Sequence, residues 1–151
     1  MHLCPIAQDG SVDLRGAQLH PVLGDTLQAT VGLYQRKGFC PPWIGYVALE
    51  HGNVVGSCGF AAPPKNSEAE IAYFTFPGNE GRGVATMMAT ALILVSQNQA
   101  RTDGVRFIAH TLPEEGPSTA ILRKLDFELI GSIDHEEDGE VWKWRRREGD
   151  V

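Results

Sequence analysis

Two closely spaced glycines, Gly81 and Gly83, mark the segment of this chain best suited to chemistry. They lie between a strand-like run that ends near Phe76 and an apolar run that begins at Val84. Glycine has no Cβ, so a ligand can approach the backbone closely, and the free N–H groups at the start of a helix attract anions. The segment therefore predicts a phosphate-binding loop.

The residues around the two glycines distinguish three kinds of phosphate site. A P-loop requires a lysine after its glycines, and none follows Gly83. A dinucleotide fingerprint requires a third small residue where this chain has Thr86, and the flanking hairpin patterns do not suit that fold. The pyrophosphate of coenzyme A can also sit on the N-terminus of a helix, and this interpretation remains.

The composition sets limits on fold and partners. With 151 residues and 42% hydrophobic content, the chain is expected to form one domain over residues 1–151. A net charge of -6 argues against nucleic acid and anionic membranes as partners, and no apolar run approaches the roughly 20 residues of a membrane span. Three cysteines without metal-type spacing favour a reducing, cytoplasmic setting.

Hydrophobic periodicity and turn residues predict ten elements. Strands are expected near 2–6 and over 43–50, 53–61, 69–76, 105–112, 128–134 and 141–147, and helices over 21–37, 83–97 and 117–125. Apolar residues surround the 83–97 helix almost completely, which predicts that it is buried against a sheet. Hairpins mixed with two crossovers predict an α+β domain.

Two blocks of the chain carry a family resemblance. The run Ala69-Glu-Ile-Ala-Tyr73, followed by Pro77 and Gly81-x-Gly83-x-Ala85-Thr86, resembles the cofactor segment of GNAT-type N-acetyltransferases, in particular the ribosomal-protein N-terminal acetyltransferase subgroup. Ser118 and Phe127 match the serine and the phenylalanine of the family's downstream helix motif, with similar spacing. The two blocks together point to this family more specifically than a pair of glycines alone would.

The resemblance implies both a fold and an activity. The fold is a GNAT-like three-layer α/β/α domain with a mixed, mostly antiparallel sheet of six or seven strands. The activity is transfer of an acetyl group from acetyl-coenzyme A (acetyl-CoA) to a primary amine by direct attack in a ternary complex, without a metal. The acceptor is a small-molecule or peptide amine, and family analogy suggests a homodimer. A non-catalytic acyl-CoA-binding module is the alternative.

The resemblance also implies which residues hold the cofactor. The loop and first helical turn bind the pyrophosphate through Gly81, Arg82, Gly83, Val84, Ala85 and Thr86. The preceding strand contributes Tyr73, Phe74 and Thr75. If that strand diverges from its neighbour, free N–H groups of Phe74 and Thr75 are expected to face the pantetheine and the thioester oxygen.

Two residues are candidates for proton transfer. Glu70 occupies the acidic position of the family strand and is expected to take a proton from the attacking amine; alternatively, it is a solvent-facing strand residue. Ser118 matches the family serine that protonates the leaving thiolate; alternatively, it satisfies the start of a helix. His110 is a further possible base, although packed histidines are commoner. The run His135–Asp138 is interpreted as a solvated hairpin turn without metal-ligand spacing.

Three positions depart from the family pattern. Glu80 places a carboxylate beside the expected pyrophosphate, so its side chain must turn outward or cofactor affinity suffers. Glu115 replaces a family asparagine, and Asp126 replaces a glycine whose left-handed conformation aspartate can adopt. The acceptor pocket is expected to be built by the parts of the chain that least resemble the family, namely the 21–37 helix, the 39–43 loop and the hairpin at Gly139. The resemblance therefore does not identify the acceptor.

Overall fold

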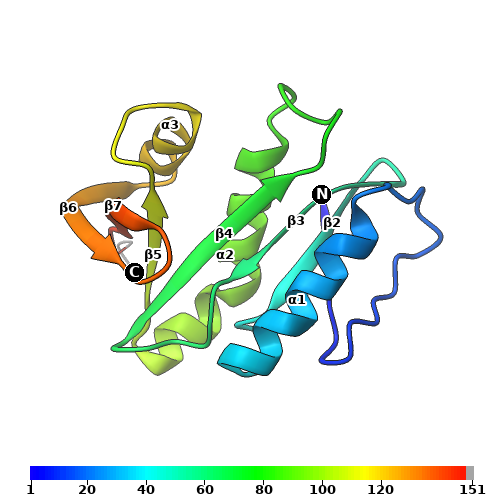
Figure 1. Ribbon diagram of the computed structural model, residues 1–151, viewed down its shortest axis with the longest axis horizontal. Helices are drawn as coiled ribbons and strands as arrows, with labels where there is room; N and C mark the ends of the chain where they lie inside the picture. The colour runs from blue at the N-terminus through cyan, green and yellow to red at the C-terminus, as the bar shows by residue number, and fades with distance from the viewer. Residues whose placement is uncertain (149–151) are drawn as a thin grey trace.

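Seven strands form one mixed sheet that carries three helices (Figure 1). The computed structural model describes residues 1–148. The sheet order is β1-β2-β3-β4-β5-β7-β6, in which only β4 and β5 are parallel. The elements are β1 (His2–Pro5), α1 (Leu23–Lys37), β2 (Gly45–Glu50), β3 (Asn53–Phe60), β4 (Glu68–Thr75), α2 (Val84–Asp103), β5 (Arg106–Thr111), α3 (Pro117–Lys124), β6 (Phe127–His135) and β7 (Gly139–Arg146). The predicted α+β fold and its element order are confirmed.

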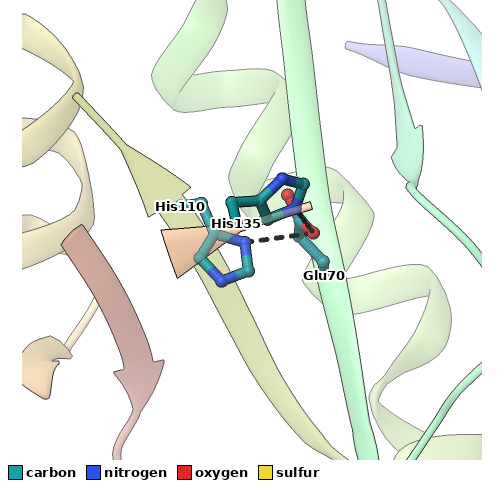
Figure 2. A group of neighbouring side chains, drawn as sticks. All are labelled: Glu70, His110 and His135. Atoms are coloured by element: carbon teal, nitrogen blue, oxygen red, sulfur yellow. Dashed lines mark ion pairs between the residues drawn. The ribbon is translucent and has the colours of Figure 1, made fainter. Parts of the chain in front are cut away.

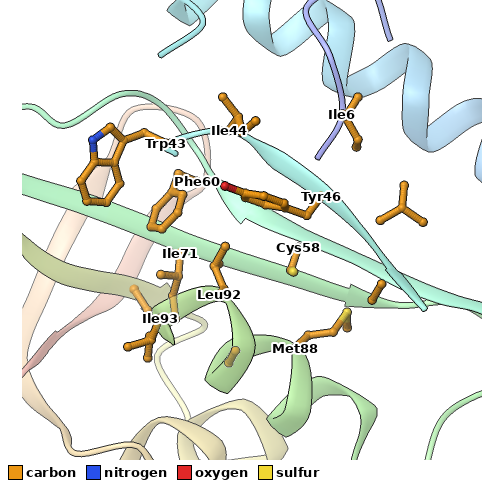
Figure 3. Packing of buried hydrophobic residues seen from close by; sticks show 14 of the residues in the cluster. Ile6, Trp43, Ile44, Tyr46, Cys58, Phe60, Ile71, Met88, Leu92 and Ile93 are labelled. Carbon is orange, nitrogen blue, oxygen red and sulfur yellow. The ribbon is translucent and has the colours of Figure 1, made fainter. Parts of the chain in front are cut away.

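The helices cover both faces of the sheet. A Cβ on Gly45 would lie 3.0 Å from Thr30 of α1, whereas one on Gly56 would lie 2.8 Å from Met88 of α2. These two glycines point to opposite faces, and Figure 3 shows the sheet between the two helices. The Tyr34 hydroxyl ties α1 to the sheet, since it donates to the Ile6 carbonyl at 2.9 Å and accepts from Gly45 N–H at 2.8 Å.

The helix ends follow local sequence signals to different degrees. Gly38, with φ of 104°, ends α1 where glycine was predicted to stop it. The α2 helix, in contrast, runs to Asp103 and ends at the left-handed Gly104, six residues beyond the predicted end at 97. The last turns of α2 expose polar side chains but bury Ala100. This one small residue continues the buried face of the helix beyond the apolar segment recognised in the sequence.

The predicted burial of α2 against the sheet holds for one face of the helix only, although its apolar residues lie almost all round it. Met88 and Leu92 are fully buried against the sheet, whereas Leu94 and Val95 are 60% and 51% exposed. One face of the helix packs on the sheet and the other faces outward, as in an ordinary two-sided surface helix. No helix among residues 1–148 is long and apolar enough to cross a bilayer.

The feature of the fold that matters most for function is a divergence of the two parallel strands. Strands β4 and β5 pair only from Glu68 with Arg106 to Glu70 with Ile108. Beyond this point β4 remains paired with β3 as far as Thr75, and β5 remains paired with β7 as far as Thr111. Each strand therefore follows its antiparallel partner, and a gap opens between them.

We expect the contact of α2 with β3 to tolerate no added methyl group. At Gly56 a Cβ would lie 2.7 Å from the Phe74 carbonyl and 2.8 Å from Met88 Sδ. Gly56→Ala should therefore destabilise the fold by about 1–3 kcal/mol, measured by urea denaturation. The matched control is Gly24→Ala in α1, where nothing lies within 4 Å of the new Cβ. There the helix should gain up to about 1 kcal/mol; equal effects at both sites would contradict this packing.

Candidate functional site

The gap between β4 and β5 opens into a cavity of about 450 Å³. Its walls come from the end of β4, the end of β5 and the segment that leads into α3. The lining residues that carry polar groups include Glu70, Tyr73, His110, Glu115, Ser118 and Thr119. The strand divergence thus brings together predicted site residues that lie up to 48 positions apart, from Glu70 to Ser118.

Backbone amides of β4 face this gap in an alternating pattern. Phe76 N–H donates to the Val55 carbonyl and the Glu70 carbonyl accepts from Ala61 N–H, both at 2.9 Å and both toward β3. Because strand residues alternate, Phe74 also bonds toward β3, whereas Tyr73 and Thr75 direct their N–H groups to the gap. The prediction of a free N–H at Phe74 is wrong; the pair that faces the gap is Tyr73 and Thr75.

The glycine loop leaves the start of α2 open. Gly81 and Gly83 have φ of 77° and 75°, and nothing lies within 4 Å of a Cβ built on either. No side chain caps the helix, whose first internal bond runs from Met87 N–H to the Gly83 carbonyl. The N–H groups of the preceding first-turn residues Val84, Ala85 and Thr86 therefore have no partner within the helix.

The charged side chains of the loop fold away from these amides. The Glu80 carboxylate accepts from Gly78 N–H at 2.6 Å, within the turn that precedes the glycines. The Arg82 guanidinium donates to the Asn79 side chain. Glu80 and Arg82 are both exposed. The repulsion that Glu80 was expected to cause is thus moderated by an outward position, and an anion at the helix start meets backbone donors.

A histidine that the sequence did not single out holds the turn in place. His20 Nε2 lies 2.8 Å from the Pro77 carbonyl, and its ring packs on Phe76 with centroids 5.1 Å apart. Nδ1 of the same ring accepts from Val22 N–H at 3.1 Å, just before α1. His20 thereby connects the start of α1 with the turn after β4. No local pattern could reveal this contact, since 57 residues separate the partners.

Ser118 lies at the start of α3 without serving as its cap. Thr119 takes that role, because its Oγ1 accepts from Gly116 N–H at 3.0 Å and donates to the Glu115 carboxylate at 2.8 Å. Burial raises the pKa of Tyr73, and the hydroxyl of Ser118 opposes this rise. Ser118 and Tyr73 both line the cavity. The helix-capping interpretation of Ser118 is wrong, because no side chain of α3 other than Thr119 bonds the start of the helix.

The two other family departures have local explanations. Arg123 donates to the Glu115 carboxylate at 2.5 Å, and this bond, with that from Thr119, lowers the pKa of Glu115. Glu115 therefore braces α3 from outside. Asp126 has φ of 68°, so it adopts the left-handed conformation expected of it after the helix.

Glu70 is part of a three-residue cluster rather than an isolated strand carboxylate. His110 Nδ1 lies 3.1 Å from Glu70 Oε1, and His135 Nε2 lies 3.9 Å from the same oxygen (Figure 2). The side chain of Glu70 is 25% exposed and that of His110 only 9%. The predicted solvated hairpin turn is found at residues 136–138, which are exposed, whereas His135 is the last residue of β6 and directs its side chain to Glu70.

The second cavity, of about 180 Å³, lies on the α1 side of the sheet. Thr30 and Leu33 of α1 line it, together with Phe74, so α1 contributes to a pocket as expected. Trp43 from the 39–43 loop does not, since it is 3% exposed and packs edge-on against Phe60. Ala72 and Tyr73 line both cavities, which therefore flank the same stretch of β4.

Comparison with known proteins gives one family match. The model of the acetyltransferase (GNAT) domain matches residues 22–128, which is more than half of the chain. This interval includes the glycine loop, both walls of the strand gap and α3. No curated protein sequence matches the chain significantly.

Solved structures share the fold at low sequence identity. A RimL ribosomal L7/L12 α-N-protein acetyltransferase in complex with coenzyme A has a TM-score of 0.63 and 24% identity over 82% of this chain and 70% of its own. An acetyltransferase from Salmonella typhimurium that modifies the N-terminal serine of L7/L12 scores 0.60 at 22% identity, over 83% and 73%. The microcin C7 self-immunity acetyltransferase MccE, in complex with acetyl-CoA and AMP, scores 0.62 at 17% identity, over 82% and 69%. At these identities the likeness establishes the fold.

The open start of α2 leads to a test that needs no knowledge of the full ligand. Inorganic pyrophosphate should bind the protein and raise its melting temperature, and Gly83→Asp should abolish this shift because a carboxylate would occupy the anion position. The matched control is Gly52→Asp, since Gly52 has φ of 76° and equally open surroundings in the β2–β3 hairpin. If both variants kept the rise in melting temperature with pyrophosphate, the anion would bind elsewhere.

Proposed function

The chain belongs to the acetyltransferase (GNAT) family, and on that premise we propose that it transfers an acetyl group from acetyl-CoA to a primary amine within a ternary complex. The gap between β4 and β5 carries this assignment. It lies between an uncapped helix start, which suits a diphosphate, and a carboxylate–histidine cluster, which suits an amine. A single opening thus joins the two halves of the reaction.

The loop residues fit the pyrophosphate of acetyl-CoA. Gly81 and Gly83 leave open space where side chains would otherwise stand, and the first-turn amides of α2 point outward. We assign the binding of the diphosphate to the backbone of Gly81 through Thr86, with Arg82 as an auxiliary cation. Its guanidinium would exchange Asn79 for a phosphate oxygen.

The amides of Tyr73 and Thr75 are the natural donors to the thioester oxygen. Negative charge develops on that oxygen as an amine attacks the carbonyl, and fixed N–H donors stabilise it. Acetyl-CoA supplies the activated carbonyl; the chain supplies the donors and the orientation. Since β4 is held by β3 through Thr75, these donors need little reorganisation.

Glu70 is our candidate for the group that accepts the proton of the amine. His110 Nδ1 lies 3.1 Å from its carboxylate, so the pair could share the proton. Glu68 lies on the same face, but its carboxylate is already engaged by Lys143 Nζ at 2.7 Å. Glu70 is thus the strand carboxylate that is free of a lysine partner and lines the cavity.

Ser118 is our candidate for the group that protonates the thiolate of coenzyme A. It is exposed at the first turn of α3, and its capping role is taken by Thr119. The hydroxyl of Tyr73 faces it and can replace the proton it gives away. The two hydroxyl groups would therefore act as a short relay at the leaving-group end of the gap.

The acceptor is an amine that reaches Glu70 from the α1 face of the sheet. RimL is an α-N-protein acetyltransferase of ribosomal L7/L12, and the Salmonella typhimurium enzyme modifies the N-terminal serine of L7/L12, so a peptide α-amine belongs in any first panel of substrates. Polyamines, aminoglycosides and amino acids complete that panel. Acidic side chains around the opening, Glu70 and Glu114 among them, favour a cationic acceptor.

Release of free thiol from acetyl-CoA, measured across the amine panel, tests the activity. Calorimetry with coenzyme A measures binding in parallel. Saturable binding with no thiol release for any amine would replace our proposal with a non-catalytic acyl-CoA-binding module. No binding of coenzyme A at millimolar concentration would exclude both the transferase and the non-catalytic binding module.

Glu70→Gln should lower kcat by about 10²–10⁴-fold because the amide cannot accept the proton of the amine. Coenzyme A affinity should stay unchanged, since the helix start is untouched. Glu68→Gln is the matched control on the same strand and face, and it should retain near-normal turnover. Equal losses in both variants would point to general electrostatics rather than to a base at Glu70.

Glu80→Gln should strengthen coenzyme A binding by roughly twofold to fivefold at low salt, because a carboxylate near the diphosphate is removed. The amide can still accept from Gly78 N–H, so the turn should keep its shape. The gain should shrink at high salt, where charges are screened. Glu128→Gln on the exposed part of β6 serves as the control; weaker binding by Glu80→Gln would overturn this reading of the loop.

A further inference from the structure

Glu70, His110 and His135 come from three different strands and converge on one point (Figure 2). One donor atom from each side chain lies within 4.8 Å of the other two. Within residues 1–148 they are the only group of three or more histidine, cysteine or acidic residues that meets this distance criterion. We call these three residues the β4–β6 cluster.

The donor set of the β4–β6 cluster matches a common type of metal site. Two imidazoles and one carboxylate are the ligands of many zinc sites that keep a fourth position open. With zinc–nitrogen bonds of about 2.0–2.1 Å, tetrahedral ligand atoms lie about 3.3 Å apart. The observed separations from Glu70 Oε1 are 3.1 Å to His110 and 3.9 Å to His135. All three donor atoms lie within 4.8 Å of one another, so closing the set around a cation requires side-chain movements of about 1–1.5 Å.

One of the two histidines has an outer partner suited to a metal ligand. His135 directs Nε2 to Glu70, and its Nδ1 lies 3.2 Å from the Glu137 N–H, which donates to it, and 3.5 Å from the Asp138 carboxylate. When Nε2 binds a cation, the ring proton lies on Nδ1, and the Asp138 carboxylate is the group that can accept it. The His110 side chain is only 9% exposed, and neither of its buried ring nitrogens makes a hydrogen bond within the described chain. A buried nitrogen without a hydrogen bond is costly, and a cation held between Nδ1 and Glu70 Oε1 would satisfy Nδ1, although Nε2 would stay without a partner in the described part of the chain.

The surrounding charges do not oppose a cation. Lys143 lies in register with His110 on the same face, but its ammonium group is bound to the Glu68 carboxylate at 2.7 Å. Asp138 adds a second negative charge beside His135. The carboxylates of Glu70 and Asp138 are thus not neutralised by a lysine or arginine among the contacts of the cluster within residues 1–148.

We propose that Glu70, His110 and His135 bind a single zinc-type divalent cation, with a fourth coordination position open to the cavity. Imidazole with carboxylate selects this class of metal over magnesium or calcium, which prefer all-oxygen sites. The site lies on the acceptor side of the strand gap. It shares Glu70 with the assigned acetyl transfer, but metal binding itself involves neither acetyl-CoA nor an amine and can be tested without them.

The test is calorimetric titration of zinc chloride into the tag-free full-length chain. Cys40 is an exposed thiol that could bind zinc by itself, so every protein carries Cys40→Ser. One equivalent should bind with a dissociation constant in the micromolar range or tighter. Cobalt should bind with the visible spectrum of a four-coordinate nitrogen–oxygen site.

Variants of the ligands and a matched control decide the assignment. His135→Asn and Glu70→Gln should each weaken zinc binding by at least about tenfold, since even loss of an outer partner costs 10–100-fold. His51→Asn removes an 85% exposed histidine that also lies 3.5 Å from a glutamate, and it should change nothing. Thermal melts show that each variant is folded. Unchanged zinc affinity in both ligand variants, or no saturable binding by the parent, overturns the proposal.

A second readout rests on the proposed function and is scored separately. Zinc bound to Glu70 occupies the lone pairs that would accept the proton of the amine, so zinc should inhibit thiol release in proportion to site occupancy. Calorimetry decides whether the site exists, even if no acceptor is found. If calorimetry shows zinc bound at this site but thiol release is unaffected at saturating zinc, the metal site stands and Glu70 is not the base.

Discussion

The divergence of β4 from β5 is the constraint on which the site depends. Backbone amides must be paired in a folded protein, and a strand that loses its neighbour exposes a row of them. Beyond the Glu70–Ile108 pair, Tyr73 and Thr75 direct their N–H groups into the gap. Leaving such groups unpaired in a buried place costs about 1–3 kcal/mol each. The fold thus keeps donors that solvent or a ligand must satisfy.

The same divergence explains why the walls of the gap are firm. Strand β4 is held by β3 through Thr75, and β5 is held by β7 through Thr111, so neither can close onto the other without loss of an antiparallel ladder. His20 fixes the turn after β4 through the Pro77 carbonyl. The donors, the loop and the carboxylate are therefore positioned by three separate sets of contacts.

Local features of the site were readable from the sequence. The order of elements, the stop at Gly38 and the left-handed Asp126 each depend on residues within a few positions, and each was predicted. The open glycine loop follows from residue types in the same way. The error over Phe74 was avoidable in principle, because the twofold alternation of a strand forbids adjacent amides from facing the same gap.

Long-range features were beyond the sequence for a physical reason. The contact of His135 with Glu70 joins residues 65 positions apart, and it depends on the register of β6 on β7 and of β7 on β5. A shift of one residue in either ladder would send the imidazole to the other face. Burial of α2 also required the packed structure, since Leu94 is as apolar as Leu92 but faces outward.

The carboxylate of Glu70 takes part in both proposals, acetyl transfer and metal binding, and it cannot serve both at the same moment. Accepting a proton from an amine and donating a lone pair to a metal both use the oxygen that faces His110 and His135. The two imidazoles lie beside this oxygen whichever partner binds. A site of this kind favours whichever cation reaches it, a metal ion or an ammonium group. On our two proposals the cleft selects for positive charge before it selects any particular acceptor, and residues other than Glu70 would have to read the shape of the acceptor.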